Sequence, residues 1–303
     1  MKLLIVDDEE LTRTGVISSI DWDSLGIDEV LQADDGINGL ETARIHRPEI
    51  ILCDVRMPRM SGITMLEQIE TFLPDSIPIF MSGYSDKEYL KAAIRLKAVS
   101  YIEKPLNPSE IQEAVLEACE QYRQKLRNHR SESLQNQENA SRLALLLSSP
   151  FGPRENEILH LFQELFPALA PGFCVTCIVV RITGDTDSWL PPIDETFHEI
   201  QNYLRSYHME CIYAEKRVQY LVYFVFSPEM PSASAKKEIR EQFVRSYQCF
   251  RKFYISAGDT VSSLSQAYSS YTSAVIRLQS SYFFPNGTFL SSSDPVPADS
   301  ATA

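Results

Sequence analysis

Short apolar runs alternate with longer amphipathic stretches over roughly the first 120 residues of the chain. The runs carry almost no polar alternation, which is typical of strands in a parallel sheet covered by helices on both faces. Strands are therefore expected at residues 3–6, 30–33, 50–53, 77–81 and 101–102, and helices at 10–20, 36–47, 63–73 and 89–94. Five such units predict a doubly wound α/β fold whose parallel sheet has the flavodoxin-like strand order 2-1-3-4-5.

A fifth helix is expected to begin near Pro108, and neither Gly nor Pro occurs from residue 109 to 149. Its apolar face is clear as far as Leu126, then turns polar until Leu143. Two interpretations follow. Either one long helix pairs with its copy in a homodimer, or a capped helix ends near residue 122 and a flexible linker follows over 123–150.

Prolines at 150 and 153 mark the start of a second pattern, over residues 151–290, whose first element is an amphipathic helix at 154–165. Strands are expected at 174–182, 210–215, 218–227 and 252–257, and helices at 193–207, 235–250 and 263–281. The pattern predicts an α+β domain with a hairpin turning at Lys216 and Arg217. The Ser-, Pro- and Ala-rich residues 291–303 read as a disordered tail or linker.

The net charge of −13 and the sequence pI near 4.9 argue against a dominant nucleic-acid surface, which needs clustered Lys and Arg. No run reaches the ~18 apolar residues that span a bilayer, and acidic residues stop the N-terminal run too early for a signal peptide. We therefore expect a cytoplasmic protein with reduced thiols. Cys174 and Cys177 stand three apart in a predicted strand, so they should point to opposite faces and bind no metal together.

Acidic residues gather at predicted strand ends. Asp7 and Asp8 follow the first strand, and Asp54 follows the third. In an open α/β sheet, the carboxyl ends of these two strands flank the crevice where ligands bind. Neighbouring carboxylates repel one another unless a cation neutralises them, and a small set of oxygen ligands suits Mg²⁺. The pattern predicts a magnesium site.

Two further strand ends supply donors. Ser82 ends the fourth strand and offers a hydroxyl, while Lys104 ends the fifth and offers an ammonium group. Pro105 follows, so a cis peptide bond is expected there. A carboxylate can act as a nucleophile toward phosphorus and form an acyl phosphate, and Asp54 has the best position for that role.

The motifs IVDDEE, CDVRMPRMSG, FMSGYSD and YIEKP resemble those of response-regulator receiver domains and extend over residues 1–122. The extra IDWDSLGID segment makes the chain most similar to the YesN/AraC-type subfamily. The resemblance implies phosphorylation by a sensor histidine kinase. It also implies a Mg²⁺ site formed by four groups: Asp7, Asp8, Asp54 and the backbone carbonyl of Arg56.

The same resemblance assigns roles to residues beyond the metal site. Ser82 would sense the phosphoryl group and Lys104 would pair with it. Tyr101 would be the aromatic side chain that swings inward on activation. The alternative for Tyr101 is simple packing on the edge strand.

The stretch ISAGDTVSSLSQAYSSYTSAVIRLQSSYFFP is similar to the end of a degenerate nucleotide-cyclase-like (GGDEF-like) domain. A working cyclase needs a Gly-Gly-acid motif at its central hairpin, where backbone and carboxylates meet substrate and metal. Here the hairpin reads AEKRVQY, with two basic residues and no glycine. We therefore expect no enzyme, but a domain that transmits a signal or dimerises.

The subfamily resemblance implies a transcription factor with a C-terminal helix-turn-helix domain, yet no basic helix pair follows Pro285. Either the chain is a truncated form, which we favour, or the protein naturally lacks that module. The expected function is a response regulator whose phosphorylation controls dimerisation and, in the full-length protein, DNA binding and transcription. The alternatives are a stand-alone phosphoacceptor acting through protein contacts and an enzyme acting on a cyclic dinucleotide.

Overall fold

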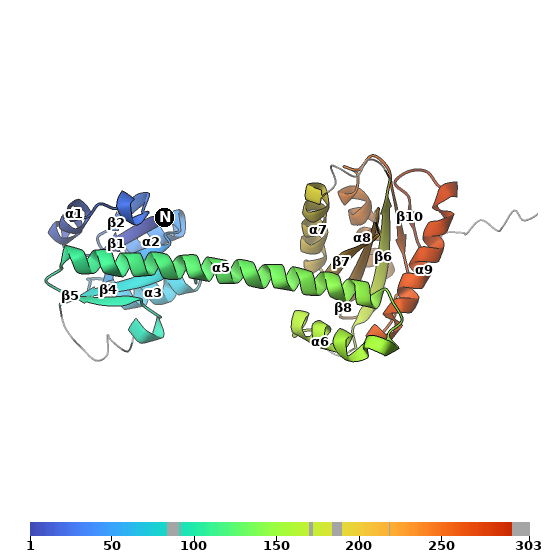
Figure 1. Cartoon of the computed structure of the whole chain (residues 1–303). Coiled ribbons are helices and arrows are strands. Elements are labelled where there is room, and N and C mark those ends of the chain that lie inside the picture. Colours follow the sequence, from blue (N-terminus) through green and yellow to red (C-terminus); the bar gives the residue numbers. More distant parts are fainter. Residues whose placement is uncertain (84–90, 92, 170–171, 184–189, 218, 293–303) are drawn as a thin grey trace, which may run out of the picture. The chain divides into compact units, whose positions relative to one another are not determined.

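The protein divides into two compact units, Met1–Glu132 and Ser133–Ala303, shown in Figure 1. The computed structural model describes residues 1–83, 91, 93–169, 172–183, 190–217 and 219–292. Within the described ranges, no helix combines the length and the apolar character needed to cross a membrane.

The first unit is a five-stranded parallel sheet with helices on both faces. Its strands are β1 (Lys2–Val6), β2 (Glu29–Ala33), β3 (Ile50–Asp54), β4 (Ile77–Ser82) and β5 (Ser100–Glu103). Its helices are α1 (Glu10–Ser19), the 3-10 turn η1 (Asp23–Leu25), α2 (Gly36–His46), α3 (Gly62–Glu70) and the first part of α5 (Pro108–Leu147). The order β2-β1-β3-β4-β5, parallel at every pair, confirms the predicted topology. The helix expected at 89–94 lies largely outside the described residues.

Both faces of this sheet are buried, which explains the uninterrupted apolar runs. Along β1, Leu3 and Ile5 face a core formed with α1 and α5, whereas Leu4 and Val6 face a second core formed with α2 and α3. The IDWDSLGID segment belongs to the first of these cores, because Trp22 in that segment is buried. The sheet is thus held rigidly from both sides, and its strand ends are fixed in space.

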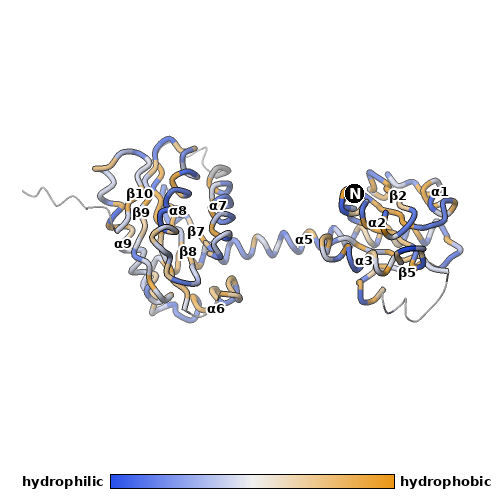
Figure 2. Tube along the Cα trace, turned by 180° about the vertical axis from the view of Figure 1, so that it is seen from behind, coloured by the Kyte–Doolittle hydropathy of each residue, from blue (hydrophilic) through white to orange (hydrophobic). Residues whose placement is uncertain are grey.

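Helix α5 is continuous over all of its 40 residues, which confirms the long-helix interpretation over the capped helix with a flexible linker. Its early residues, such as Val115, pack in the first unit. Its last turns place Leu143 and Leu147 in a core of the second unit. Residues 127–138 are all exposed, and the hydropathy colouring in Figure 2 shows this stretch as predominantly hydrophilic. Pairing of α5 with a second copy stays a prediction.

The second unit is a mixed α/β domain around one five-stranded sheet of order β10-β9-β6-β8-β7. Its strands are β6 (Cys174–Ile182), β7 (Glu210–Arg217), β8 (Tyr220–Ser227), β9 (Phe253–Ala257) and β10 (Phe289–Leu290). Its helices are α6 (Glu155–Leu165), α7 (Leu190–Arg205), α8 (Ala233–Ser246) and α9 (Ala267–Gln279), with short 3-10 turns η2 (Gly152–Arg154), η4 (Leu264–Gln266) and η5 (Ser280–Phe283). The two-residue strand β10, parallel to β9, was not predicted because it is too short to leave a pattern.

Two cores cover the faces of this second sheet. The end of α5, α6 and α9 pack on one face, and α7 and α8 pack on the other. Cys177 belongs to the first core. Cys174 is also buried, but its three-residue offset along β6 turns it to the opposite face, and both are free thiols. This geometry agrees with the prediction that the pair does not form a metal site.

The predicted position of the hairpin turn was wrong. Lys216 and Arg217 both lie in β7, and Arg217 pairs with Tyr220 of β8. Lys216 is the extra residue of a β-bulge between Glu215 and Arg217. The connection therefore comes after Arg217, where Gln219 has a left-handed φ of 81°. Because the polar residues of a bulge and of a turn look alike in sequence, the pattern placed the turn too early.

Candidate functional site

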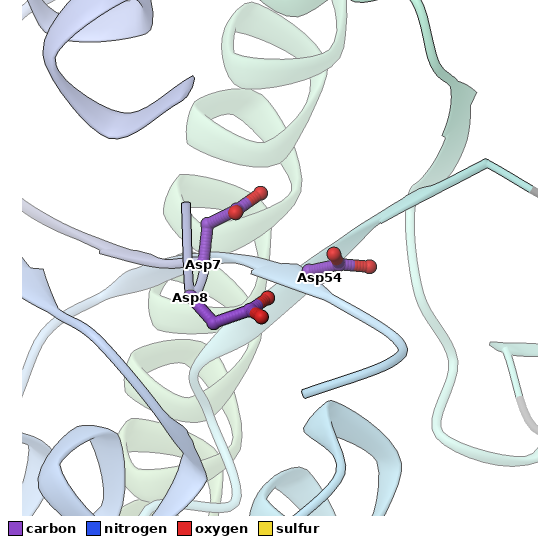
Figure 3. A group of neighbouring side chains, drawn as sticks. All are labelled: Asp7, Asp8 and Asp54. Carbon is purple, nitrogen blue, oxygen red and sulfur yellow. The ribbon is translucent and has the colours of Figure 1, made fainter. Parts of the chain in front are cut away.

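Three carboxylates meet at the carboxyl end of the first sheet (Figure 3). Asp7 and Asp8 come directly after β1, and Asp54 is the last residue of the adjacent β3. One oxygen from each side chain lies within 4.8 Å of the others. Asp7 is fully buried, Asp54 is nearly buried with its side chain 10% exposed, and Asp8 is exposed. The group is thus open to solvent at one corner.

Lys104 joins two of these carboxylates. It directly follows β5, and its Nζ donates to Asp54 Oδ2 at 2.7 Å and to Asp7 Oδ2 at 2.9 Å. Its backbone N–H donates to the carbonyl of Ser82 at 2.8 Å, which ties it to the end of β4. The peptide bond from Lys104 to Pro105 is cis, as expected. The ammonium group therefore neutralises part of the negative charge of the site.

The site perturbs two pKa values in ways that follow from burial and charge. Burial raises the pKa of Asp7, and the hydrogen bond from Lys104 only partly offsets this effect. For Lys104, burial acts to lower the pKa, but the bonds to Asp54 and Asp7 and their negative charges outweigh it and raise the pKa above its ordinary value. Lys104 therefore stays charged at neutral pH.

Backbone groups fix the orientation of the carboxylates. The N–H of Glu9 donates to Asp7 Oδ1 at 2.9 Å, and the N–H of Arg56 donates to Asp54 Oδ1 at 3.2 Å. The side chain of Arg13, one turn into α1, donates to the carbonyl of Asp7 at 2.6 Å. Sequence reasoning missed Arg13, because a basic residue near the start of a helix carries no local sign of such a bond.

Gly62, at the start of α3, was also missed. A Cβ atom at this position would overlap the carbonyl oxygen of Asp54, well inside van der Waals contact. The N–H of Gly62 also donates to the carbonyl of Val55 at 3.2 Å. Only glycine therefore allows α3 to start this close to the strand that carries Asp54. The Ser61-Gly62 pair was the available signal, since Ser61 caps α3 through the N–H of Thr64.

The other predicted residues lie on or just after the strands β3, β4 and β5. Ser82 is buried at the end of β4, level with Glu103 of β5. Tyr101 lies on β5 beside Phe80 and is half-buried against the α2–α3 core. Arg56 has its backbone beside Asp54, while a metal-binding role of its carbonyl stays a prediction. Ser82 and Arg56 thus lie at the carboxyl edge of the sheet, whereas Tyr101 lies two residues before the end of β5.

The donor set suits a hard divalent cation. Carboxylate oxygens from three side chains are available, and Asp7 and Asp54 share a single ammonium group. Hard oxygen donors, few in number and open on one side to water, favour Mg²⁺ over metals that prefer nitrogen or sulfur. The acidic triad is of the type found in Mg²⁺-binding receiver sites.

Curated proteins and solved structures match the first unit, and family models match both units. Among curated proteins, an uncharacterized response regulatory protein of Staphylococcus epidermidis and the transcriptional regulatory protein HptR of Staphylococcus aureus are each 34% identical over 111 residues. That segment is 37% of this chain and 43% of each relative, so the chain spans less than half the length of the curated relatives it matches.

Among solved structures, a two component transcriptional regulator AraC from Clostridium phytofermentans is 48% identical, and the REC domain of AraT from Geobacillus stearothermophilus is 36% identical. They cover 42% and 41% of this chain and 98% and 97% of their own, each with a TM-score of 0.39. Residues 3–116 match the response regulator receiver domain family, and residues 168–279 match the GGDEF-like domain family. The chain therefore combines a response regulator receiver domain with a GGDEF-like domain.

Proposed function

We propose that this protein is a phosphorylation-controlled switch of a two-component system, in which Asp54 accepts a phosphoryl group from a sensor histidine kinase. The observation that carries the proposal is the Asp54 carboxylate, held 2.7 Å from Lys104 Nζ and grouped with Asp7 and Asp8. The receiver match over residues 3–116 supports the same class of reaction. Because receivers of this family typically act in the cytoplasm, we propose that location.

The chemistry follows from the charges around Asp54. A carboxylate oxygen of Asp54 attacks the phosphorus of a phosphohistidine; the new P–O bond forms as the P–N bond breaks, and the released imidazole nitrogen takes a proton from water. The product is an aspartyl phosphate. The Lys104 ammonium stabilises negative charge on the phosphoryl oxygens. Four groups would hold Mg²⁺: Asp7, Asp8, Asp54 and the backbone carbonyl of Arg56. The ion supplies charge neutralisation to the same oxygens when bound.

The switch would act through neighbours on β4 and β5. In the proposal, the buried hydroxyl of Ser82 donates to a phosphoryl oxygen, and Tyr101 turns inward as Ser82 moves toward Asp54. Tyr101 is half-buried and lies on a strand directly paired with β4, so a shift at Ser82 reaches it through the sheet. In this proposal Tyr101 therefore takes part in the switch and does not only pack on the edge strand.

In the proposal, the protein transmits its signal by forming a homodimer through α5. Leu126 and Leu134 are 48% and 54% exposed on this helix, eight residues apart, and are available to meet the same residues of a second copy. We propose that phosphorylation strengthens this pairing. We also propose a transcriptional output, supported by the similarity to HptR over 43% of its length. DNA contact would then be made by a helix-turn-helix domain outside the two units.

We further propose that the GGDEF-like domain forms no cyclic dinucleotide. The hairpin end that a cyclase uses for substrate and metal carries a bulged Lys216 and a paired Arg217, and the sequence from 216 to 220 contains neither glycine nor acid. Incubation of the protein with nucleoside triphosphates and Mg²⁺ tests this point. A cyclic product in that assay would overturn it.

The phosphoacceptor proposal is tested by labelling the full chain with a small-molecule phosphodonor and Mg²⁺. Wild-type protein should gain one phosphoryl group by intact mass, and Asp54→Asn should gain none. Asp75→Asn is the matched control, because Asp75 is a partly exposed carboxylate in the same unit away from the triad, and it should label normally. Persistent labelling of Asp54→Asn would place the acceptor elsewhere.

A further inference from the structure

The second unit contains a basic cavity of about 600 Å³ between β6, the β7–β8 hairpin and α9. Its charged lining consists of Arg181, Lys216 and Arg217, and no Asp or Glu occurs among the described residues that line it. The chain as a whole carries a net charge of −13, so this local excess of positive charge opposes the overall trend. The volume lies within the usual range for small-molecule sites.

Arg181 is the buried cation of this cavity, with only 8% of the residue exposed. Its Nη2 donates to Ser281 Oγ at 2.8 Å, and its guanidinium stacks on the rings of Tyr254 and Tyr282, at 5.0 and 4.8 Å from their centroids. Its Nε is buried without a hydrogen-bond acceptor. Among the residues that the structure describes, no carboxylate forms an ion pair with it.

A buried cation without a counter-charge is costly, and proteins usually supply an anion for it. Here one hydroxyl and two aromatic rings, all neutral, take the place of the carboxylate that would ordinarily neutralise an arginine. The free Nε–H is a directed donor, and a guanidinium edge with a free donor suits the two oxygens of a carboxylate or phosphate. Arg181 is therefore the cation of this cavity that lacks a counter-charge among the described residues.

The rim of the cavity adds two more cations. The β-bulge directs Lys216 toward the end of α5, where its Nζ donates to the carbonyl and hydroxyl oxygens of Ser148 at 2.6 and 2.8 Å, and it lies 4.2 Å from the ring centroid of Tyr271. Arg217 is exposed and forms no ion pair within the described part of the chain. Lys216 is thus largely committed to Ser148, while Arg217 remains available to a ligand.

Aromatic and apolar groups complete the lining, among them Tyr220, Tyr268 and Leu278. We propose that this cavity binds a small organic anion. Its carboxylate or phosphate pairs with Arg181 and Arg217, and its planar or apolar body lies against the tyrosine rings and Leu278. Tyrosine rings favour flat bodies, and the volume excludes polymers. The proposal is independent of the phosphoacceptor site.

The test uses the full chain and three probes of similar size: phenyl phosphate, benzoate and the neutral benzyl alcohol. Isothermal titration should show saturable binding of at least one anion and no binding of benzyl alcohol. The anion that binds more tightly shows whether the site prefers a phosphate or a carboxylate. The Arg181 Nε–H resonance of ¹⁵N-arginine-labelled protein should shift with the same saturation curve, because that donor gains an acceptor.

Variants separate the site from nonspecific attraction. Arg217→Gln changes an exposed side chain, so it should fold normally and weaken anion binding roughly fivefold or more. Arg205→Gln removes an exposed cation of α7 that does not line the cavity, and it should bind like wild type. The proposal is overturned if neither anion binds, if benzyl alcohol binds equally well, or if Arg217→Gln and Arg205→Gln bind alike.

Discussion

Lys104 neutralises the two carboxylates, Asp7 and Asp54, that would also hold Mg²⁺. Its ammonium group should therefore oppose metal binding even though it assists phosphoryl transfer. We predict that Lys104→Met binds Mg²⁺ more tightly than wild type and is phosphorylated more slowly. The two effects have opposite signs because the ammonium repels the cation but stabilises the phosphoryl oxygens.

The size of the effect follows from the geometry. Lys104 Nζ lies 2.7 and 2.9 Å from carboxylate oxygens of the proposed metal ligands, so a shared carboxylate separates the two cations. Two unit charges at about 4 Å interact by about 1 kcal/mol in water, and a divalent ion doubles this value. The Lys104 side chain is 21% exposed, so solvent screens this interaction and the value for water applies. The prediction is a roughly tenfold to thirtyfold tighter Mg²⁺ affinity.

Isothermal titration of Mg²⁺ into the full chain measures the affinity, and the phosphodonor labelling assay measures the rate. Lys104→Arg is the matched control, because it keeps the positive charge and should show no gain in Mg²⁺ affinity. The metal-free Lys104→Met protein should also be less stable, by about 1–3 kcal/mol, since buried Asp7 loses its ammonium partner. Equal or weaker Mg²⁺ binding by Lys104→Met would refute the reasoning.

Two other changes test the supports of the site and of the proposed dimer. Gly62→Ala should destabilise the receiver by about 1–3 kcal/mol in urea unfolding and slow labelling, because the added Cβ overlaps the carbonyl of Asp54. Gly15→Ala is the control: it adds a Cβ to α1 where there is open space, and in the same urea experiment it should be neutral or stabilising. Replacing exposed Leu126 and Leu134 by Glu should remove phosphorylation-dependent dimerisation, measured by sedimentation, without lowering the melting temperature. Unchanged dimerisation would exclude this stretch of α5 from the interface.

The receiver fold was predictable because its signals are strong and mutually consistent. Strands buried on both faces leave uninterrupted apolar runs, and functional side chains at the carboxyl ends of parallel strands are brought together by topology alone. Asp7, Asp54 and Lys104 are up to 97 residues apart in sequence, yet the strand order alone predicts that they lie at one edge of the sheet.

Features that depend on side-chain direction or local irregularity were not predictable. The bulge at Lys216 shifts the hairpin register by one residue, and nothing in AEKRVQY distinguishes a bulge from a turn. The contact of Arg13 with the carbonyl of Asp7 depends on the rotamer of a long side chain. Arg181 was not singled out from the run CVTCIVVRI, because its burial and its lack of a counter-charge depend on the packing of α9 and the turn after it.

The central claim is that Asp54, and no other carboxylate of the triad, becomes an acyl phosphate. Borohydride reduces an aspartyl phosphate to homoserine, which leaves a permanent mark at the acceptor position. After labelling with a phosphodonor and Mg²⁺, peptide mass spectrometry of the reduced full chain should find homoserine at position 54. Homoserine at position 7 or 8, or at none of the three positions despite a phosphoryl mass gain, would contradict the account.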